Sequence, residues 1–129
     1  MKKSISLLTA LLLIFFTVPT QANPRYSLTI SYQKTSSAKP ISWKLNCRPA
    51  SGTHPIAKLA CQEIRATTSP FTRPAADEIC TKIYGGDEKA TVTGRWAGKQ
   101  IKRTFTKTNG CEIDRWDQLS QTLTGKPRS

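Results

Sequence analysis

The chain has 129 residues, with 20 lysines and arginines, 8 aspartates and glutamates, and a formal net charge of +12 at pH 7. It is long enough for one domain with a modest core. A single histidine and four cysteines without a Cys-x-x-Cys pair exclude the usual zinc-ligand spacings. The basic residues are spread without a dense block, which favours general attraction to anionic surfaces over nucleic-acid recognition.

The amino terminus has the pattern of a secretory signal peptide. Lys2 and Lys3 precede an apolar run from Ile5 to Val18, and a break at Pro19 leads to an expected cleavage site at Ala22–Asn23. The run is short for a membrane span, and nothing similar follows it. We therefore expect a secreted or periplasmic mature protein without a membrane span.

Alternation of apolar and polar residues predicts two β-hairpins. Tyr26–Tyr32 alternates along its whole length and is followed, after a polar turn, by the alternating segment Ile41–Cys47. Ala90–Trp96 and Ile101–Phe105 flank a turn at Ala97-Gly98-Lys99 and should form the second hairpin.

Helical spacing of apolar residues predicts one helix from about Pro55 to Ala66, because proline is tolerated in a first helical turn. Turn signals at Ser69-Pro70 and Arg73-Pro74 predict an irregular connection. The stretch around Trp116 is expected to add a last short packed segment. The expected organisation is a signal peptide at residues 1–22, a folded domain at 23–119 and a basic, flexible tail at 120–129.

Four cysteines, Cys47, Cys61, Cys80 and Cys111, in an exported chain of this size predict two disulfides. Three pairings are possible, and the residues alone leave them open. Pairing in sequential order would close two separate loops, each stabilising the fold by roughly 3 to 4 kcal/mol in the chain-entropy model.

The sequence offers few catalytic candidates. His54, the only histidine, lies in a Gly-Thr-His-Pro turn, where capping or packing is favoured over catalysis. The pairs Asp77-Glu78 and Asp87-Glu88 are adjacent in sequence, so their side chains point apart in extended chain, and we interpret them as solvated loop charges. We predict no enzyme, no metal site and no cofactor.

One segment, Cys80-Thr81-Lys82-Ile83-Tyr84, suggests a different chemistry. If Cys80 is oxidised, the backbone beside Lys82 is restrained while the long cationic side chain points outward. A restrained, protruding lysine favours a substrate-like binding segment. In the competing interpretation, Lys82 is one of many surface lysines.

Over most of Tyr26–Cys111 the chain resembles the Streptomyces subtilisin inhibitors and their relatives, a family of secreted serine-protease inhibitors. The motifs that carry the resemblance are Cys47-Arg48-Pro49, Gly52-Thr53-His54-Pro55 with Ala60-Cys61, Cys80-Thr81-Lys82-Ile83-Tyr84, Gly94-Arg95-Trp96-Ala97-Gly98, and Arg103-Thr104-Phe105 with Asn109-Gly110-Cys111. Their number and order make the resemblance specific.

The resemblance implies an α+β fold with a single antiparallel sheet of about five strands covered by two helices. It implies the disulfides Cys47–Cys61 and Cys80–Cys111 and a homodimer formed through the sheet. The second helix would have to come from Thr67–Glu78, where the residues themselves give only turn signals.

The resemblance also implies a reactive site with its scissile bond between Lys82 and Ile83. Lys82 would fill the primary specificity pocket of a trypsin-like or subtilisin-like serine protease, and the residues beside it would pair with the enzyme as an added strand. The other residues expected to contact the protease are Ile79, Cys80, Thr81 and Tyr84.

The chain departs from the family where many relatives continue Tyr-Asp-Pro and this sequence has Tyr84-Gly85-Gly86. The change removes a stiffening proline and predicts a looser loop exit. An alternative hypothesis is an interaction protein of the cell envelope, with the family fold but no inhibitory activity, whose basic surface binds anionic partners.

Overall fold

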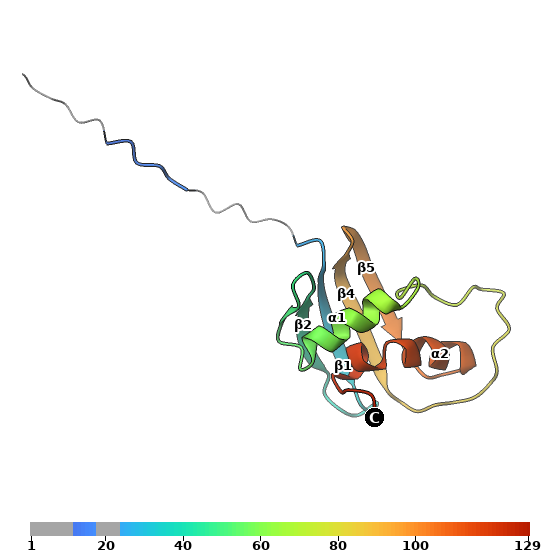
Figure 1. Cartoon of the computed structure of the whole chain (residues 1–129). Helices are drawn as coiled ribbons and strands as arrows, with labels where there is room; N and C mark the ends of the chain where they lie inside the picture. Colours follow the sequence, from blue (N-terminus) through green and yellow to red (C-terminus); the bar gives the residue numbers. More distant parts are fainter. Residues whose placement is uncertain (1–11, 18–23) are drawn as a thin grey trace, which may run out of the picture.

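The computed structural model describes residues 12–17 and 24–129, and Figure 1 shows one antiparallel sheet with helices packed on one of its faces. The five strands lie in the spatial order β3-β2-β1-β4-β5. The strands are β1 (Ser27–Gln33), β2 (Ile41–Asn46), β3 (Ser51–Gly52), β4 (Lys89–Trp96) and β5 (Lys99–Phe105), and the helices are α1 (Ala57–Ala66), α2 (Gly110–Gln118) and α3 (Ser120–Thr124). The predicted α+β class and sheet are confirmed.

The expected signal peptide falls largely on residues 1–11 and 18–23, which lie outside the described residues. Residues 12–17 form neither helix nor strand. Among the described residues, none of the helices has the length and apolar character that crossing a bilayer requires.

The central strand β1 shows why alternation predicted the sheet. Leu28, Ile30 and Tyr32 are buried on the helix side, and the residues between them lie on the other face. Ile30 lies opposite Trp43 of β2 and Val92 of β4, so the apolar residues of three strands share one layer. Both predicted hairpins are confirmed, with the two-residue strand β3 added at the β2 edge.

The second long helix lies at α2, so the expectation that it would come from Thr67–Glu78 is wrong. Asn109-Gly110 had the character of a turn, but the Asn109 side chain accepts a hydrogen bond from the Glu112 backbone amide at 3.0 Å and caps α2. Trp116, 2% exposed, fixes this helix in the core.

The two disulfides are Cys47–Cys61 and Cys80–Cys111, as the resemblance implied. The first joins the end of β2 to α1. The second joins the long connection between α1 and β4 to the first turn of α2, so a segment without helix or strand is attached to an element of the core.

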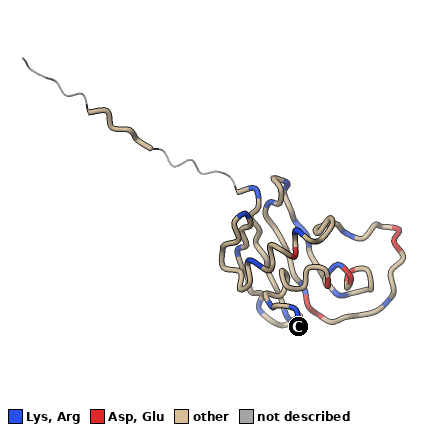
Figure 2. Tube along the Cα trace, in the orientation of Figure 1, with Lys and Arg blue, Asp and Glu red and all other residues tan. Residues whose placement is uncertain are grey.

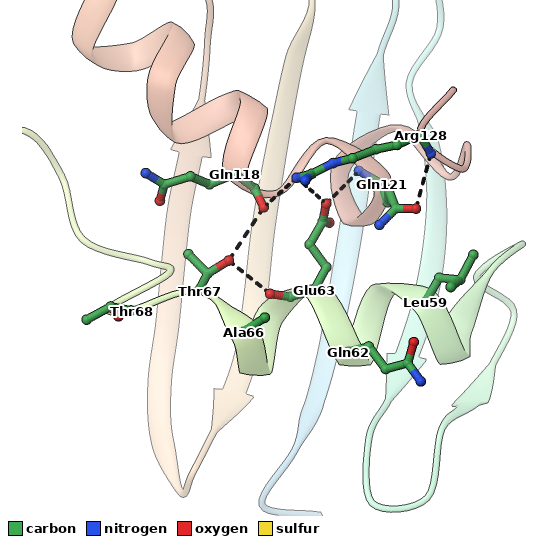
Figure 3. Close-up of a pocket in the computed structure, with 9 residues that line it drawn as sticks. All are labelled: Leu59, Gln62, Glu63, Ala66, Thr67, Thr68, Gln118, Gln121 and Arg128. Atoms are coloured by element: carbon green, nitrogen blue, oxygen red, sulfur yellow. Dashed lines mark hydrogen bonds and ion pairs between the residues drawn. The ribbon is translucent and has the colours of Figure 1, made fainter.

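The expectation of a flexible tail is wrong for Ser120–Thr124, which forms α3 and buries Leu123 completely. Glu63 of α1 holds this end of the chain. It accepts hydrogen bonds from the amide and hydroxyl of Thr122, both at 2.7 Å. It also forms an ion pair with Arg128 at 2.8 Å, which Figure 3 shows. The partners lie about sixty residues apart in sequence, so no local pattern indicates the contact.

This arrangement predicts unequal effects of two substitutions. Glu63→Ala leaves the buried polar groups of Thr122 without their acceptor, and we expect the free energy of unfolding to fall by about 2–4 kcal/mol. Arg128→Ala should cost about 1 kcal/mol or less, because its side chain is 53% exposed. Urea unfolding of both variants at pH 7 measures the difference, and equal losses would contradict the central role of Glu63.

Candidate functional site

The long connection between α1 and β4 forms an exposed loop that extends to the side of the sheet (Figure 1). Near its end Ile79 is 98% exposed, Ile83 59% and Tyr84 62%, and Lys82 is exposed between them. Exposed apolar side chains beside a protruding lysine are available to a binding partner.

The loop is attached to α2 immediately before Lys82. Cys80 is bonded to Cys111, and the Gly110 backbone amide donates to the Thr81 carbonyl at 2.9 Å. The approach at Gly110 is so close that a Cβ there would lie 2.0 Å from the Thr81 hydroxyl oxygen. A side chain at position 110 would therefore force the Thr81 side chain to move, and glycine lets the two segments meet as they do.

A second attachment follows Lys82 and Ile83. The Gly85 backbone amide donates to the Lys107 carbonyl at 2.7 Å, and a Cβ at Gly85 would lie 3.0 Å from both the Ile113 and the Lys107 side chains. The Tyr84 hydroxyl donates to Asp87, which raises the pKa of Tyr84. The exit that lacks the family's proline is thus held by hydrogen bonds.

Glu88, just beyond the loop exit, is half-buried and makes two strong contacts. It accepts from Tyr32 at 2.6 Å and from Lys107 at 2.7 Å. Burial alone would raise the pKa of Glu88, but the hydrogen bonds from Lys107 and Tyr32 and the charge of Lys107 lower it. Burial and the contact with Glu88 raise the pKa of Tyr32 to about 12. The interpretation of Glu88 as a solvated loop charge is wrong.

The start of the loop is held against the sheet by a buried arginine. Arg103 of β5 donates to the Thr72 carbonyl at 3.3 Å and pairs with Glu112 of α2 at 3.1 Å. Further along, Glu78 pairs with Arg115 of α2 at 3.3 Å. The start of the loop therefore contacts β5, and its later part contacts α2.

His54, the one catalytic candidate with an imidazole, is 5% exposed and bonded to backbone on both sides. Its Nδ1 accepts from the Ile56 amide at 3.2 Å, so the proton is on Nε2, which donates to the Thr122 carbonyl at 2.9 Å. Burial lowers the pKa of His54, opposed by the Thr122 bond and the charge of Glu63. His54 fixes α1 to α3 and faces no solvent-filled site.

The described part of the chain gives little support for a metal site or for a ligand pocket. Residues 12–17 and 24–129 contain no group of three or more His, Cys, Asp or Glu side chains placed to hold a metal ion. An open pocket of about 590 Å³ lies beside Glu63 and Arg128, remote in sequence from Lys82, and those two charged groups already neutralise each other (Figure 3).

The predicted residues are consecutive in the chain. In the structure Cys80 and Thr81 are attached to α2, and Lys82, Ile83 and Tyr84 lie exposed between the two attachments. Ile79 lies before the disulfide. Sequence reasoning missed the supporting residues Gly110, Lys107, Glu88 and Asp87, whose partners come from other parts of the chain.

Comparison with known proteins identifies the family of the chain. Residues 22–110 match the family described as "Subtilisin inhibitor-like". The chain belongs to the subtilisin inhibitor-like family. It is 37% identical over 89 residues to "Subtilisin inhibitor-like protein 3" of Streptomyces coelicolor, covering 65% of this chain and 82% of that protein.

Two longer relatives bear inhibitor names. The chain is 46% identical over 70 residues to a "Probable subtilase-type protease inhibitor" of Streptomyces avermitilis, covering 52% of this chain and 48% of that protein. It is 38% identical over 73 residues to a "Transglutaminase-activating metalloprotease inhibitor" of Streptomyces mobaraensis, covering 54% and 49%. The match therefore spans about half the length of these two relatives.

The burial of His54 predicts a pH dependence of stability. Its pKa is lower in the folded than in the unfolded chain, where it is about 6.5, so the unfolded state binds the proton first. The free energy of unfolding should fall as the pH drops from about 7 to 5, by at most about 1.4 kcal/mol per pH unit. Urea unfolding of wild type and His54→Gln tests this, and equal slopes in both would contradict it.

Proposed function

We propose that this chain is a proteinaceous inhibitor of serine proteases that presents Lys82–Ile83 as a substrate-like bond. The observation that carries the proposal is the pair of attachments around that bond. Three exposed residues lie between Thr81, bonded to Gly110, and Gly85, bonded to Lys107. The family membership and the names of the relatives support inhibition in general.

The attachments explain how a substrate-like segment acts as an inhibitor. A loop already held in an extended, bound-like shape loses little conformational entropy when a protease binds it. If the peptide bond is cut, Thr81 and Gly85 stay attached to the same support, so the new ends remain in place to rejoin. The Cys80–Cys111 disulfide keeps the cut chain covalently joined.

Lys82 favours proteases with an acidic residue at the base of the primary pocket, which are the trypsin-like enzymes. Subtilisin-like enzymes are the second class, because their pockets accept long side chains. Thr81, Tyr84 and Ile79 would contact the protease on either side of the bond, through backbone pairing and exposed side-chain surface. Replacing Lys82 with Met or Leu should redirect inhibition toward subtilisin-like enzymes.

The proposal includes export through the predicted signal peptide, with a secreted or periplasmic mature protein. It includes no cofactor and no nucleic-acid partner. A homodimer through the sheet, implied by the family resemblance, is a separate prediction, and sedimentation velocity of the purified protein tests it.

The first test is titration of the purified, oxidised protein against trypsin and a subtilisin in parallel, in moderate salt. We expect stoichiometric inhibition of at least one enzyme and its loss, by at least a hundredfold in the inhibition constant, in Lys82→Ala. Lys39→Ala, which removes another exposed lysine, is the matched control. If folded wild-type protein leaves both enzymes active, the proposal fails for these two classes.

Removing each disulfide in turn distinguishes restraint of the loop from general stability of the fold. We expect a trypsin-like enzyme to cut the double variant Cys80→Ala/Cys111→Ala at the Lys82–Ile83 bond and then to release the cut protein. Inhibition by this variant should therefore be temporary. Both this variant and Cys47→Ala/Cys61→Ala should lose roughly 3 to 4 kcal/mol of stability. Both variants are incubated with the protease at a temperature where circular dichroism shows that they are folded. Mass spectrometry should then find cleavage only in the variant that lacks Cys80–Cys111. Equal cleavage of the two variants would contradict the role of this disulfide.

A further inference from the structure

The apolar layer between the sheet and the helices is only partly covered at one end of β2. Ile41, Trp43 and Leu45 point to the same side of this strand, because side chains alternate along it. Leu45 is completely buried, but Trp43 is half-buried and Ile41 is 55% exposed. The apolar layer therefore extends beyond the helices, toward the turn that joins β1 to β2.

A pocket of about 470 Å³ lies at this uncovered end of the layer. Ile41, Trp43 and Tyr32 of the sheet line it together with the β1–β2 turn and the C-terminal segment after α3. Figure 1 shows that the chain ends beside this turn. The volume is in the range of sites that hold small molecules, so we look for a small ligand and not for a partner protein.

Neighbouring side chains hold the indole of Trp43 in place. The His54 ring meets it edge-on, with 5.3 Å between the ring centroids, and the Tyr32 ring lies nearly parallel to it, at 15° and 6.2 Å. A Cβ at Gly125 would lie 3.0 Å from Trp43 and 3.2 Å from Pro55, so glycine lets the C-terminal segment approach the indole. The Gly-Thr-His-Pro motif, which the proposed inhibition does not use, thus supports an aromatic wall of the pocket.

The two side-chain hydroxyls that line the pocket already donate hydrogen bonds elsewhere. The Tyr32 hydroxyl donates to Glu88 at 2.6 Å, and the Thr124 hydroxyl donates to the Ser120 carbonyl at 2.7 Å. A neutral polar ligand, such as a sugar, would find no free hydroxyl donor and would cover an apolar wall. The pocket therefore favours a ligand with an apolar body.

Three lysines supply the charge of the pocket. Lys34, Lys39 and Lys126, here called the pocket lysines, line it from the β1–β2 turn and the C-terminal segment, and no carboxylate lines it. None of the three forms an ion pair in the part of the chain that the structure describes. Lys126 acts on the charge of Glu88, but that carboxylate is already paired with Lys107 at 2.7 Å. The apolar wall beside them distinguishes the pocket lysines from the cations exposed elsewhere on the surface.

We propose that this pocket binds a small aromatic carboxylate, whose ring packs against Trp43 and whose charge is paired by the pocket lysines. A flat ring suits a wall made of aromatic side chains, and each lysine offers three donors to a carboxylate. A cationic ligand would be repelled by the same lysines. The pocket includes none of the residues 79–84, so the proposal does not rest on the proposed protease inhibition.

The probe is 2-naphthoate, titrated by NMR against ¹⁵N-labelled protein in about 0.15 M salt. The indole N–H signal of Trp43, identified by its absence in Trp43→Phe, reports on the pocket. Trp96, which packs against Tyr26 at the other end of the sheet, is the internal control. We expect a saturable shift of the Trp43 signal with a dissociation constant below about 1 mM, and none of the Trp96 signal. The uncharged 2-naphthalenemethanol should bind at least about fivefold more weakly.

A pair of variants tests the role of the lysines. The pocket variant combines Lys34→Gln and Lys126→Gln, and the control variant combines Lys58→Gln and Arg65→Gln, which removes the same charge from exposed residues of α1. We expect the pocket variant to lose at least about fivefold in affinity for 2-naphthoate and less than about twofold for 2-naphthalenemethanol. The control variant should lose less than about twofold for both. The amide spectra confirm that both variants are folded.

Each other outcome overturns the proposal. If the Trp43 signal shows no saturable shift, the pocket does not bind an aromatic acid. Equal binding of the acid and the alcohol, or equal losses in the two variants, would mean that the pocket lysines do not recognise the charge. Tighter binding of decanoate, an acid without a ring, would assign the pocket to aliphatic acids. Shifts of the Trp96 signal with the same midpoint would show adventitious binding to apolar surface.

Discussion

The attachment of the exposed loop to the first turn of α2 is the constraint on which the candidate site depends. Two bonds of different kinds act at neighbouring positions, the Cys80–Cys111 disulfide and the hydrogen bond from Gly110 to Thr81. Helix α2 is itself fixed by Trp116, which lies in the core against the sheet. Lys82, next in the chain, therefore projects from a segment whose position is set by the packed interior.

The exit of the loop is supported in a different way, through Lys107. Its carbonyl receives the Gly85 amide, and its side chain is held by Glu88 and lies 5.1 Å from the centre of the Trp116 ring. One residue thus joins the loop exit to the same helix that supports the loop entry. A proline restricts its own backbone and that of the residue before it, whereas these contacts connect the loop exit at Tyr84-Gly85-Gly86 to the core.

Much of the fold could be predicted from the sequence because its signals are local. The alternation in Tyr26–Tyr32 predicted β1 since one face of that strand is buried and the other is not. Helix α2 was missed because it begins at Asn109-Gly110, a pair that is equally typical of a turn. Glu63 and Arg128 gave no signal, since only the folded chain brings them together.

The difference between local signals and contacts made only in the folded chain also applies to the candidate site. The exposed residues of the loop could be predicted, because the resemblance places them in one continuous segment. The residues that support them lie at the exit of the loop, in the β5–α2 connection and in α2, and each is common in other roles. Glu88, for example, is adjacent to Asp87 in sequence and has the composition of a loop charge, yet only Glu88 is directed toward Lys107 and Tyr32.

The few acidic side chains of this basic chain are used mainly to connect its segments. Four of the eight carboxylates are used in ion pairs that hold the long loop, α2 and the C-terminal segment in place. Within the described residues the other lysines and arginines form no ion pair. The chain therefore uses half of its few carboxylates where segments distant in sequence meet, and its excess positive charge remains at the surface.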